Sequence, residues 1–162
     1  MAIQTPQALF LLQLAEMYDI EQKLAQMLPI LAQEANESQA KEAFTQHEQE
    51  TQQHAVNIEQ CFQILGQKPM AVENHATIGL KQDHDTFVQQ QQPSQDILTM
   101  FTLSAGSQSE YLEMANYNSL ISAAKNLGYK QIVPLLQQNL QQEEAAAKKL
   151  ATIAQKLGQQ TA

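Results

Sequence analysis

The sequence contains no arginine, and its nine basic residues are all lysines. Seventeen acidic residues outnumber them, so the formal net charge at pH 7 is −8. Nucleic-acid binders neutralise phosphates with basic side chains, and arginine is the residue that most often reads guanine. Anionic lipid surfaces also attract basic segments. The charge therefore argues against nucleic acids and against membranes as partners.

The sequence also has few cysteines, glycines and prolines and no long apolar run, which limits the possible folds and cellular compartments. A single cysteine, Cys61, excludes an internal disulfide and any site built from several thiolates. Five glycines and five prolines supply too few turn residues for an all-β domain. No apolar run approaches the roughly 18 residues of a membrane-spanning helix. The apolar segment 8–12 lacks the flanking features of a signal peptide, so we expect a cytoplasmic protein.

The residues that are abundant favour helices. The 29 glutamines, for example, suit a neutral helical surface. Thr5 and Pro6 begin a first helix, within which Pro29 should cause a bend or an end. Gly66 ends a second helix, and Gly128 forms the turn between two further helices. The predicted helices cover about residues 5–35, 37–65, 94–127 and 130–157, with a crossover at 67–93 that contains a short helix.

Two short links and one long crossover define the predicted topology. Helices joined by a short link pack antiparallel as hairpins. Two hairpins joined by one long connection make the ferritin-like class of four-helix bundle. We therefore predict an all-α chain in which residues 1–162 form one ferritin-like antiparallel four-helix bundle domain.

Each predicted helix has an apolar stripe with helical spacing, and each stripe includes or adjoins a carboxylate near its middle. Glu21 lies in the first stripe, Glu110 and Glu113 in the third, and Glu143 in the fourth. Residues equidistant from the turn of a hairpin lie at one level, which places Glu113 level with Glu143. The same reasoning places Glu21 level with the carboxylate of the second helix.

The second stripe combines two histidines with that carboxylate. His47 and His54 are seven residues apart on one face, and Glu50 lies beside them. Carboxylates gathered inside a bundle would each cost several kcal/mol if left unpaired. No lysine lies on the stripes at this level, so the natural counter-charge is a metal cation or a pair of them. Carboxylate oxygens with imidazole suit iron or manganese.

Each of these residues also has a simpler explanation. A single core glutamate is usually a boundary residue whose carboxylate reaches water, and a single core histidine is usually hydrogen-bonded. Because all four helices carry such a residue at the same level, a metal site is favoured over those explanations.

Tyr117 is expected in the core, where its phenol could donate a hydrogen bond to the site. Cys61 is expected to be a small buried hydrophobe, and the crossover histidines His75 and His84 to lie at the surface.

The candidate ligands share a stripe or flank one, at the middle of the four helices. They are Glu21, His47, Glu50, His54, Glu110, Glu113 and Glu143.

Several segments of the chain resemble the ferritin-like stress proteins of the YciE/YciF type, in the same helix order. The resemblance rests on residues 17–24 (MYDIEQKL), 43–51 (AFTQHEQET), 65–69 (LGQKP), 110–117 (EYLEMANY) and 140–146 (LQQEEAA). It implies a rubrerythrin-like bundle, a homodimer, a dinuclear carboxylate centre and a role in stress. Glu21, Glu50, Glu113 and Glu143 fall on the family's carboxylate positions, and His47 on a recurrent histidine.

The chain departs from the wider ferritin-like pattern, which places Glu-x-x-His on two helices. Gln53 and Ala146 stand where the two histidines would be. His54 is available to substitute for a missing imidazole. Tyr111 replaces a histidine that is frequent in relatives, and Ala147 replaces an expected acid. One metal ion, two metal ions or a degenerate site are all compatible with these departures.

Three functions are compatible with this sequence. The first is a stress-response metalloprotein with two iron or manganese ions that reacts with a small oxidant such as oxygen or peroxide, as an oxidoreductase would. The second is a metal-free or degenerate bundle that serves as an assembly or interaction protein. The third, iron storage, ranks last because it requires a closed shell of many subunits.

Overall fold

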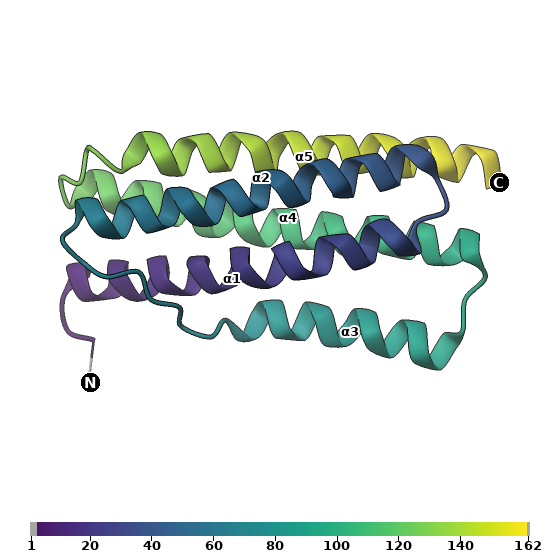
Figure 1. Ribbon diagram of the computed structural model, residues 1–162, viewed down its shortest axis with the longest axis horizontal. Coiled ribbons are helices and arrows are strands. Elements are labelled where there is room, and N and C mark those ends of the chain that lie inside the picture. The colour runs from purple at the N-terminus through teal and green to yellow at the C-terminus, as the bar shows by residue number, and fades with distance from the viewer. Residues whose placement is uncertain (1–2, 162) are drawn as a thin grey trace.

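The computed structural model describes residues 3–161, and within that range it has five helices and no strand. Four long helices lie side by side and a fifth runs along their flank (Figure 1). The predicted all-α, ferritin-like fold class is confirmed. The helices are α1 Pro6–Glu34, α2 Ser38–Ile64, α3 His75–Gln91, α4 Gln95–Asn126 and α5 Val133–Thr161.

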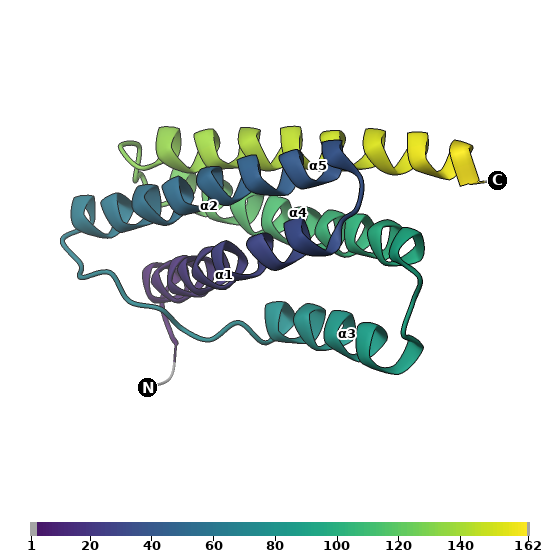
Figure 2. The ribbon, with the colours of Figure 1, turned by 45° about the vertical axis from the view of Figure 1, so that its right-hand side comes forward.

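The long helices form a ring in which α1 packs on α2, α2 on α5, α5 on α4 and α4 on α1. Each of these neighbours is antiparallel to the next (Figures 1 and 2). Because α2 and α4 run in the same direction, the crossover must carry the chain back along the length of the bundle. The helix α3 spans much of that distance and packs against α4.

Helix ends follow the chemistry of the residues that form them. The Thr5 hydroxyl accepts a hydrogen bond from the Ala8 amide at 3.1 Å, which caps α1. Gly66 and Gly128 have φ of 69° and 76°, the left-handed conformation that glycine adopts without strain. Each closes a Schellman turn, since the amide two residues past the helix-capping residue reaches back to the last turn of the helix. The helix α1 continues through Pro29, so of the two predicted effects of this proline, a bend or an end, the end does not occur.

The last helix differs from its prediction at both ends. It begins at Val133 rather than near residue 130, because Lys130 and Ile132 donate their amides to the turn that follows Gly128. Pro134 therefore lies in the first helical turn, where no amide donor is needed. The helix also passes through Gly158 and reaches Thr161, since Gly158 does not adopt the left-handed conformation that would stop it.

The crossover is fixed to the bundle by polar and aromatic contacts. The Val72 amide donates to the Ala15 carbonyl at 3.1 Å. His84 Nε2 lies 2.8 Å from Glu34 Oε2 of α1, and the rings of Phe87 and Phe101 stack with centroids 3.8 Å apart. His84 is buried, so its predicted surface position was wrong: it faces α1 and α4, whereas His75 is exposed as expected.

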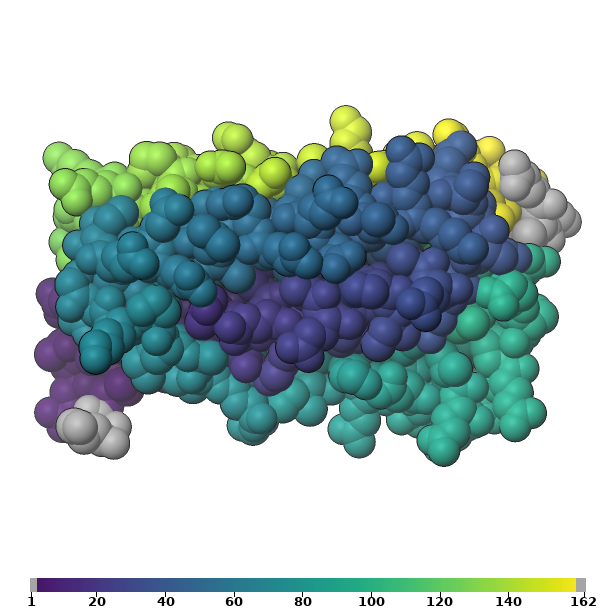
Figure 3. Space-filling view, viewed as in Figure 1, coloured from purple at the N-terminus to yellow at the C-terminus, as the bar shows by residue number. Residues whose placement is uncertain are grey.

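The apolar core is divided into two clusters along the bundle. One cluster surrounds Phe10, Met17 and Leu120, and the other surrounds Leu28 and Phe44. Side chains of α1 and α2 close one face of the bundle over this interior (Figure 3). None of the helices within residues 3–161 has the length and apolar composition needed to cross a membrane.

Gly106 sets how closely α4 approaches its neighbours. A Cβ at this position would lie 2.8 Å from Phe44 Cε1 and 3.1 Å from Leu150 Cδ1. Both side chains are buried, so they have little room to move. We expect Gly106→Ala to lower the free energy of unfolding by about 1–3 kcal/mol, measured in urea.

Gly79 in α3 provides the matched control, because a Cβ there meets nothing within 4 Å in the described chain. Gly79→Ala should leave stability unchanged or raise it slightly, since alanine favours helix. Equal effects of the two substitutions would show that the α4 contact is not close-packed.

Candidate metal centre

Six of the seven predicted ligands meet in one layer between the two apolar clusters. Five of them are 0% exposed and His47 is 4% exposed. All four long helices contribute, as the stripes predicted. The six are Glu21 of α1, His47 and His54 of α2, Glu110 and Glu113 of α4, and Glu143 of α5.

These side chains form two groups that share one carboxylate. The first group contains His47, Glu110, Glu113 and Glu143, and the second contains Glu21, His54 and Glu143. Within each group the candidate ligand atoms lie within 4.8 Å of one another. Glu143 is the residue that belongs to both groups.

The two oxygens of Glu143 face different histidines. Oε1 lies 2.8 Å from His54 Nδ1, and Oε2 lies 3.4 Å from His47 Nε2. His47 Nε2 is also 3.1 Å from Glu110 Oε1, and His54 Nδ1 is 3.5 Å from Glu21 Oε2. Glu143 therefore occupies the centre of the layer, between the two imidazoles.

Most of these polar atoms make no hydrogen bond of good geometry. Among the described residues, ten buried side-chain atoms lack one, and nine of the ten belong to the six residues of the centre. Six of the nine lie in histidine–carboxylate contacts of 2.8–3.5 Å, whereas Glu110 Oε2 and both Glu113 oxygens have no such contact. The tenth is the Thr51 hydroxyl. Buried polar groups are normally satisfied, and an unpaired one costs about 1–3 kcal/mol. The unsatisfied oxygens of Glu110 and Glu113, beside weakly aligned histidine–carboxylate pairs, indicate a layer with room for a further ligand.

The charges of the layer lead to the same conclusion. Four carboxylates lie in it with two imidazoles, and no lysine is among the buried residues of the described chain. Even if both histidines carried a proton, two negative charges would remain. Two divalent cations would balance the four carboxylates while the histidines stay neutral, which is the form in which imidazole binds metals.

Burial shifts the protonation of these groups in the metal-free protein. Desolvation raises the pKa of Glu21 and Glu113 above the usual range, and raises that of Glu143 to about 7. Burial lowers the pKa of His54, but Glu143 and Glu21 outweigh it and raise the value to about 10. Without a metal, the layer therefore retains protons that solvent-exposed groups would release.

A hydrogen-bond network holds one side of the layer in place. The Tyr117 hydroxyl donates to Glu21 Oε1, which confirms the contact expected of that phenol. Asn139 Nδ2 donates to the Tyr117 oxygen at 2.8 Å and to the His54 carbonyl at 3.2 Å. Asn139 also accepts from Asn57 at 2.7 Å. Asn139 was not among the predicted site residues, although its position four residues before Glu143, on the buried face of α5, could have pointed to it.

Glu50 lies outside both groups. About a quarter of its side chain, 24%, is exposed, and its Oε2 lies 3.5 Å from His47 Nδ1. A step of three residues along a helix turns a side chain about 60° away from His47, which takes Glu50 toward α5 and solvent. The contact with the His47 imidazole holds the pKa of Glu50 below its usual range.

Nearly the whole chain matches one known protein family. A family described as a domain of unknown function, DUF892, matches residues 5–162. The chain belongs to the DUF892 family. This confirms the resemblance drawn from the sequence motifs.

Relatives of this DUF892 chain include protein YciF of Escherichia coli K12. The two are 26% identical over 160 residues, which cover 95% of this chain and 93% of YciF. The crystal structure of that stress protein superimposes with a TM-score of 0.88 at 24% identity, covering 97% of this chain and 99% of YciF. YcfI from Rhodopseudomonas palustris, described as a candidate structural protein, has a TM-score of 0.90 at 33% identity, covering 93% and 95% of the two chains.

Proposed function

We propose that this DUF892 chain is a stress-response metalloprotein that holds two iron or manganese ions between its helices. The observation that carries the proposal is the layer of six buried residues from all four long helices, in which nine side-chain atoms make no hydrogen bond of good geometry. The charge balance of four carboxylates against two divalent cations supports it. The stress role rests on the relation to YciF, which is a stress protein.

The two groups suggest how the ligands would be divided. His47, Glu110 and Glu113 would hold one ion, and Glu21 and His54 the other, with Glu143 available to both. Carboxylate and imidazole ligands suit iron and manganese, whereas the chain offers no set of thiolates. Such ions supply redox chemistry toward oxygen or peroxide.

The surrounding residues would orient the ligands and exclude water. Tyr117 and Asn139 fix the Glu21 carboxylate and the backbone beside His54. The apolar clusters on both sides keep the layer at low dielectric, where charge interactions are strong. This arrangement would lower the stability of the metal-free fold, because a leucine at such a position would pack better than an unpaired glutamate.

The description of YcfI favours a second candidate, a metal-free bundle with a structural role. In that case the buried carboxylates would be protonated or paired with histidine. The homodimer implied by the family resemblance remains a prediction for both functions.

Elemental analysis separates the two functions. Protein loaded with Fe²⁺ without oxygen, or with Mn²⁺, and then passed through gel filtration should retain about two ions per chain. Glu113→Ala should lose most of this metal, because it removes a fully buried ligand. Glu42→Ala, an exposed substitution in α2, should keep all of it. Metal at background level in the wild-type protein under both loadings would eliminate the metalloprotein proposal.

A further inference from the structure

We infer that metal ions reach the buried layer through a pocket between α2 and α5, past Glu50, and that Lys149 and Gln46 form the gate of this route. The inference rests on the proposed metal centre. It concerns how the centre is filled rather than what it binds.

Exposure locates the side on which the centre meets solvent. Five of the six candidate ligands are 0% exposed, and His47 is the one whose side chain, at 5%, has contact with solvent. The Glu50 side chain, which contacts His47, is 24% exposed and lies nearer the surface. A path from water to the centre therefore begins at Glu50 and passes His47.

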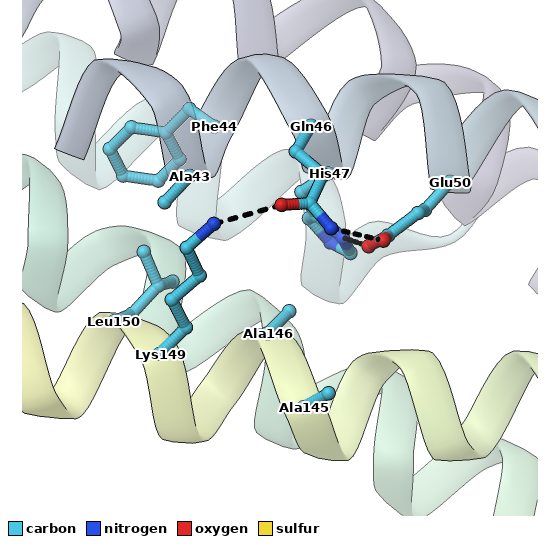
Figure 4. Close-up of a pocket in the computed structure, with 9 residues that line it drawn as sticks. All are labelled: Ala43, Phe44, Gln46, His47, Glu50, Ala145, Ala146, Lys149 and Leu150. Carbon is cyan, nitrogen blue, oxygen red and sulfur yellow. Dashed lines mark hydrogen bonds and ion pairs between the residues drawn. The ribbon is translucent and has the colours of Figure 1, made fainter. Parts of the chain in front are cut away.

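A pocket occupies this position. It has a volume of about 70 Å³, and His47 and Glu50 form part of its wall (Figure 4). A water molecule needs about 10–15 Å³ measured in this way, so a cation with part of its hydration shell fits. The α5 side of the wall includes Ala145 and Ala146, whose small side chains leave the space open.

A chain of polar contacts crosses the pocket from α5 to α2. Lys149 Nζ donates to Gln46 Oε1 at 2.8 Å, and Gln46 Nε2 donates to Glu50 Oε1 at 2.8 Å. Glu50 in turn contacts His47 Nδ1. Figure 4 shows these contacts joined end to end, with Lys149 reaching across from α5. Because Lys149 is partly exposed, its side chain can leave Gln46 without disturbing the core.

The charges suit a route for cations. The Glu50 carboxylate attracts a cation to the inner end of the pocket, beside a histidine that faces the buried carboxylates. The positively charged Lys149 ammonium repels a cation at the outer end of the pocket. Local charges of this kind change association rates more than they change affinity.

The test measures the rates at which Co²⁺ is taken up and released by the full-length protein. Stopped-flow absorbance follows uptake, and a chase with excess EDTA follows release. Ala145→Leu, which adds bulk at an exposed helical position of the pocket wall, should slow both rates about tenfold or more and leave the equilibrium dissociation constant nearly unchanged. Lys149→Met should speed uptake about tenfold by removing the positive charge and the bond to Gln46.

Lys148→Met is the matched control, since it removes the same charge from the adjacent, exposed position. It should leave both rates within about twofold of the wild type. Glu50→Gln should slow uptake with little change in affinity. A hundredfold loss of affinity in Glu50→Gln would instead make Glu50 a ligand and overturn its role on the route.

The outcomes for route and centre are distinguishable. Wild-type protein that binds Co²⁺, with the same rates in Ala145→Leu and Lys149→Met, would overturn the route and leave the metal centre intact. Wild-type protein that binds no metal ion would overturn both.

Discussion

Glu143→Ala is expected to abolish binding of both metal ions, whereas Glu21→Ala is expected to abolish only one. Glu143 belongs to both groups of candidate ligands, and each of its oxygens faces a different histidine. Glu21 belongs to a single group. Titration with Mn²⁺, followed by electron paramagnetic resonance of the free ion, should give about two, one and no bound ions for wild type, Glu21→Ala and Glu143→Ala.

Glu144→Ala provides the control, because it removes a carboxylate from the adjacent exposed position of α5. It should bind metal as the wild type does. If Glu143→Ala and Glu21→Ala retained equal amounts of Mn²⁺, Glu143 would not be shared and the division into two overlapping groups would be wrong.

The metal-free protein is expected to lose stability as the pH rises from about 4.5 to about 7. The folded pKa of Glu143 is raised to about 7 from an ordinary value of 4.5, and the pKa values of Glu21 and Glu113 are raised as well. A group with a raised folded pKa stabilises the fold below its unfolded pKa and loses that effect as pH passes the folded pKa. The shift of Glu143 alone corresponds to about 3 kcal/mol.

Metal should reverse this trend, because protons compete with it for the same carboxylates and imidazoles. Urea unfolding at pH 5 and pH 8, each with EDTA and with Mn²⁺, measures both effects. Metal should stabilise the protein far more at pH 8 than at pH 5. Glu113→Leu should be more stable than the wild type without metal and should show a smaller loss between the two pH values. Metal-free stability that rises from pH 5 to pH 8 would contradict the prediction.

The sequence predicted the fold well because its signals are local. Gly66 and Gly128 end helices through their own conformational freedom, and Thr5 caps α1 with its own hydroxyl. The starts and ends of the first, second and fourth helices in the chain lie within one residue of the predictions. The start of α5 was missed because the turn after Gly128 depends on hydrogen bonds that residue types do not specify.

The layer of ligands was predicted for a different reason. A glutamate on an apolar stripe is conspicuous, and helical geometry brings such positions to one level. Two residues show the limits of that reasoning. Glu50 lies at the right level but points toward solvent, which depends on the rotation of α2 about its axis. His84 is buried because α3 packs on the bundle, and nothing in the crossover sequence predicts which face of a short helix is covered.

The helix α3 makes the bundle one-sided. It lies along the flank formed by α1 and α4 (Figure 2). The pocket that reaches His47 lies on the other flank, between α2 and α5 (Figure 4). The proposed route would place the exchange of ions on the flank of the bundle that α3 does not cover. A molecule that settled over α2 and α5 at this pocket would then close the route without contacting a buried carboxylate.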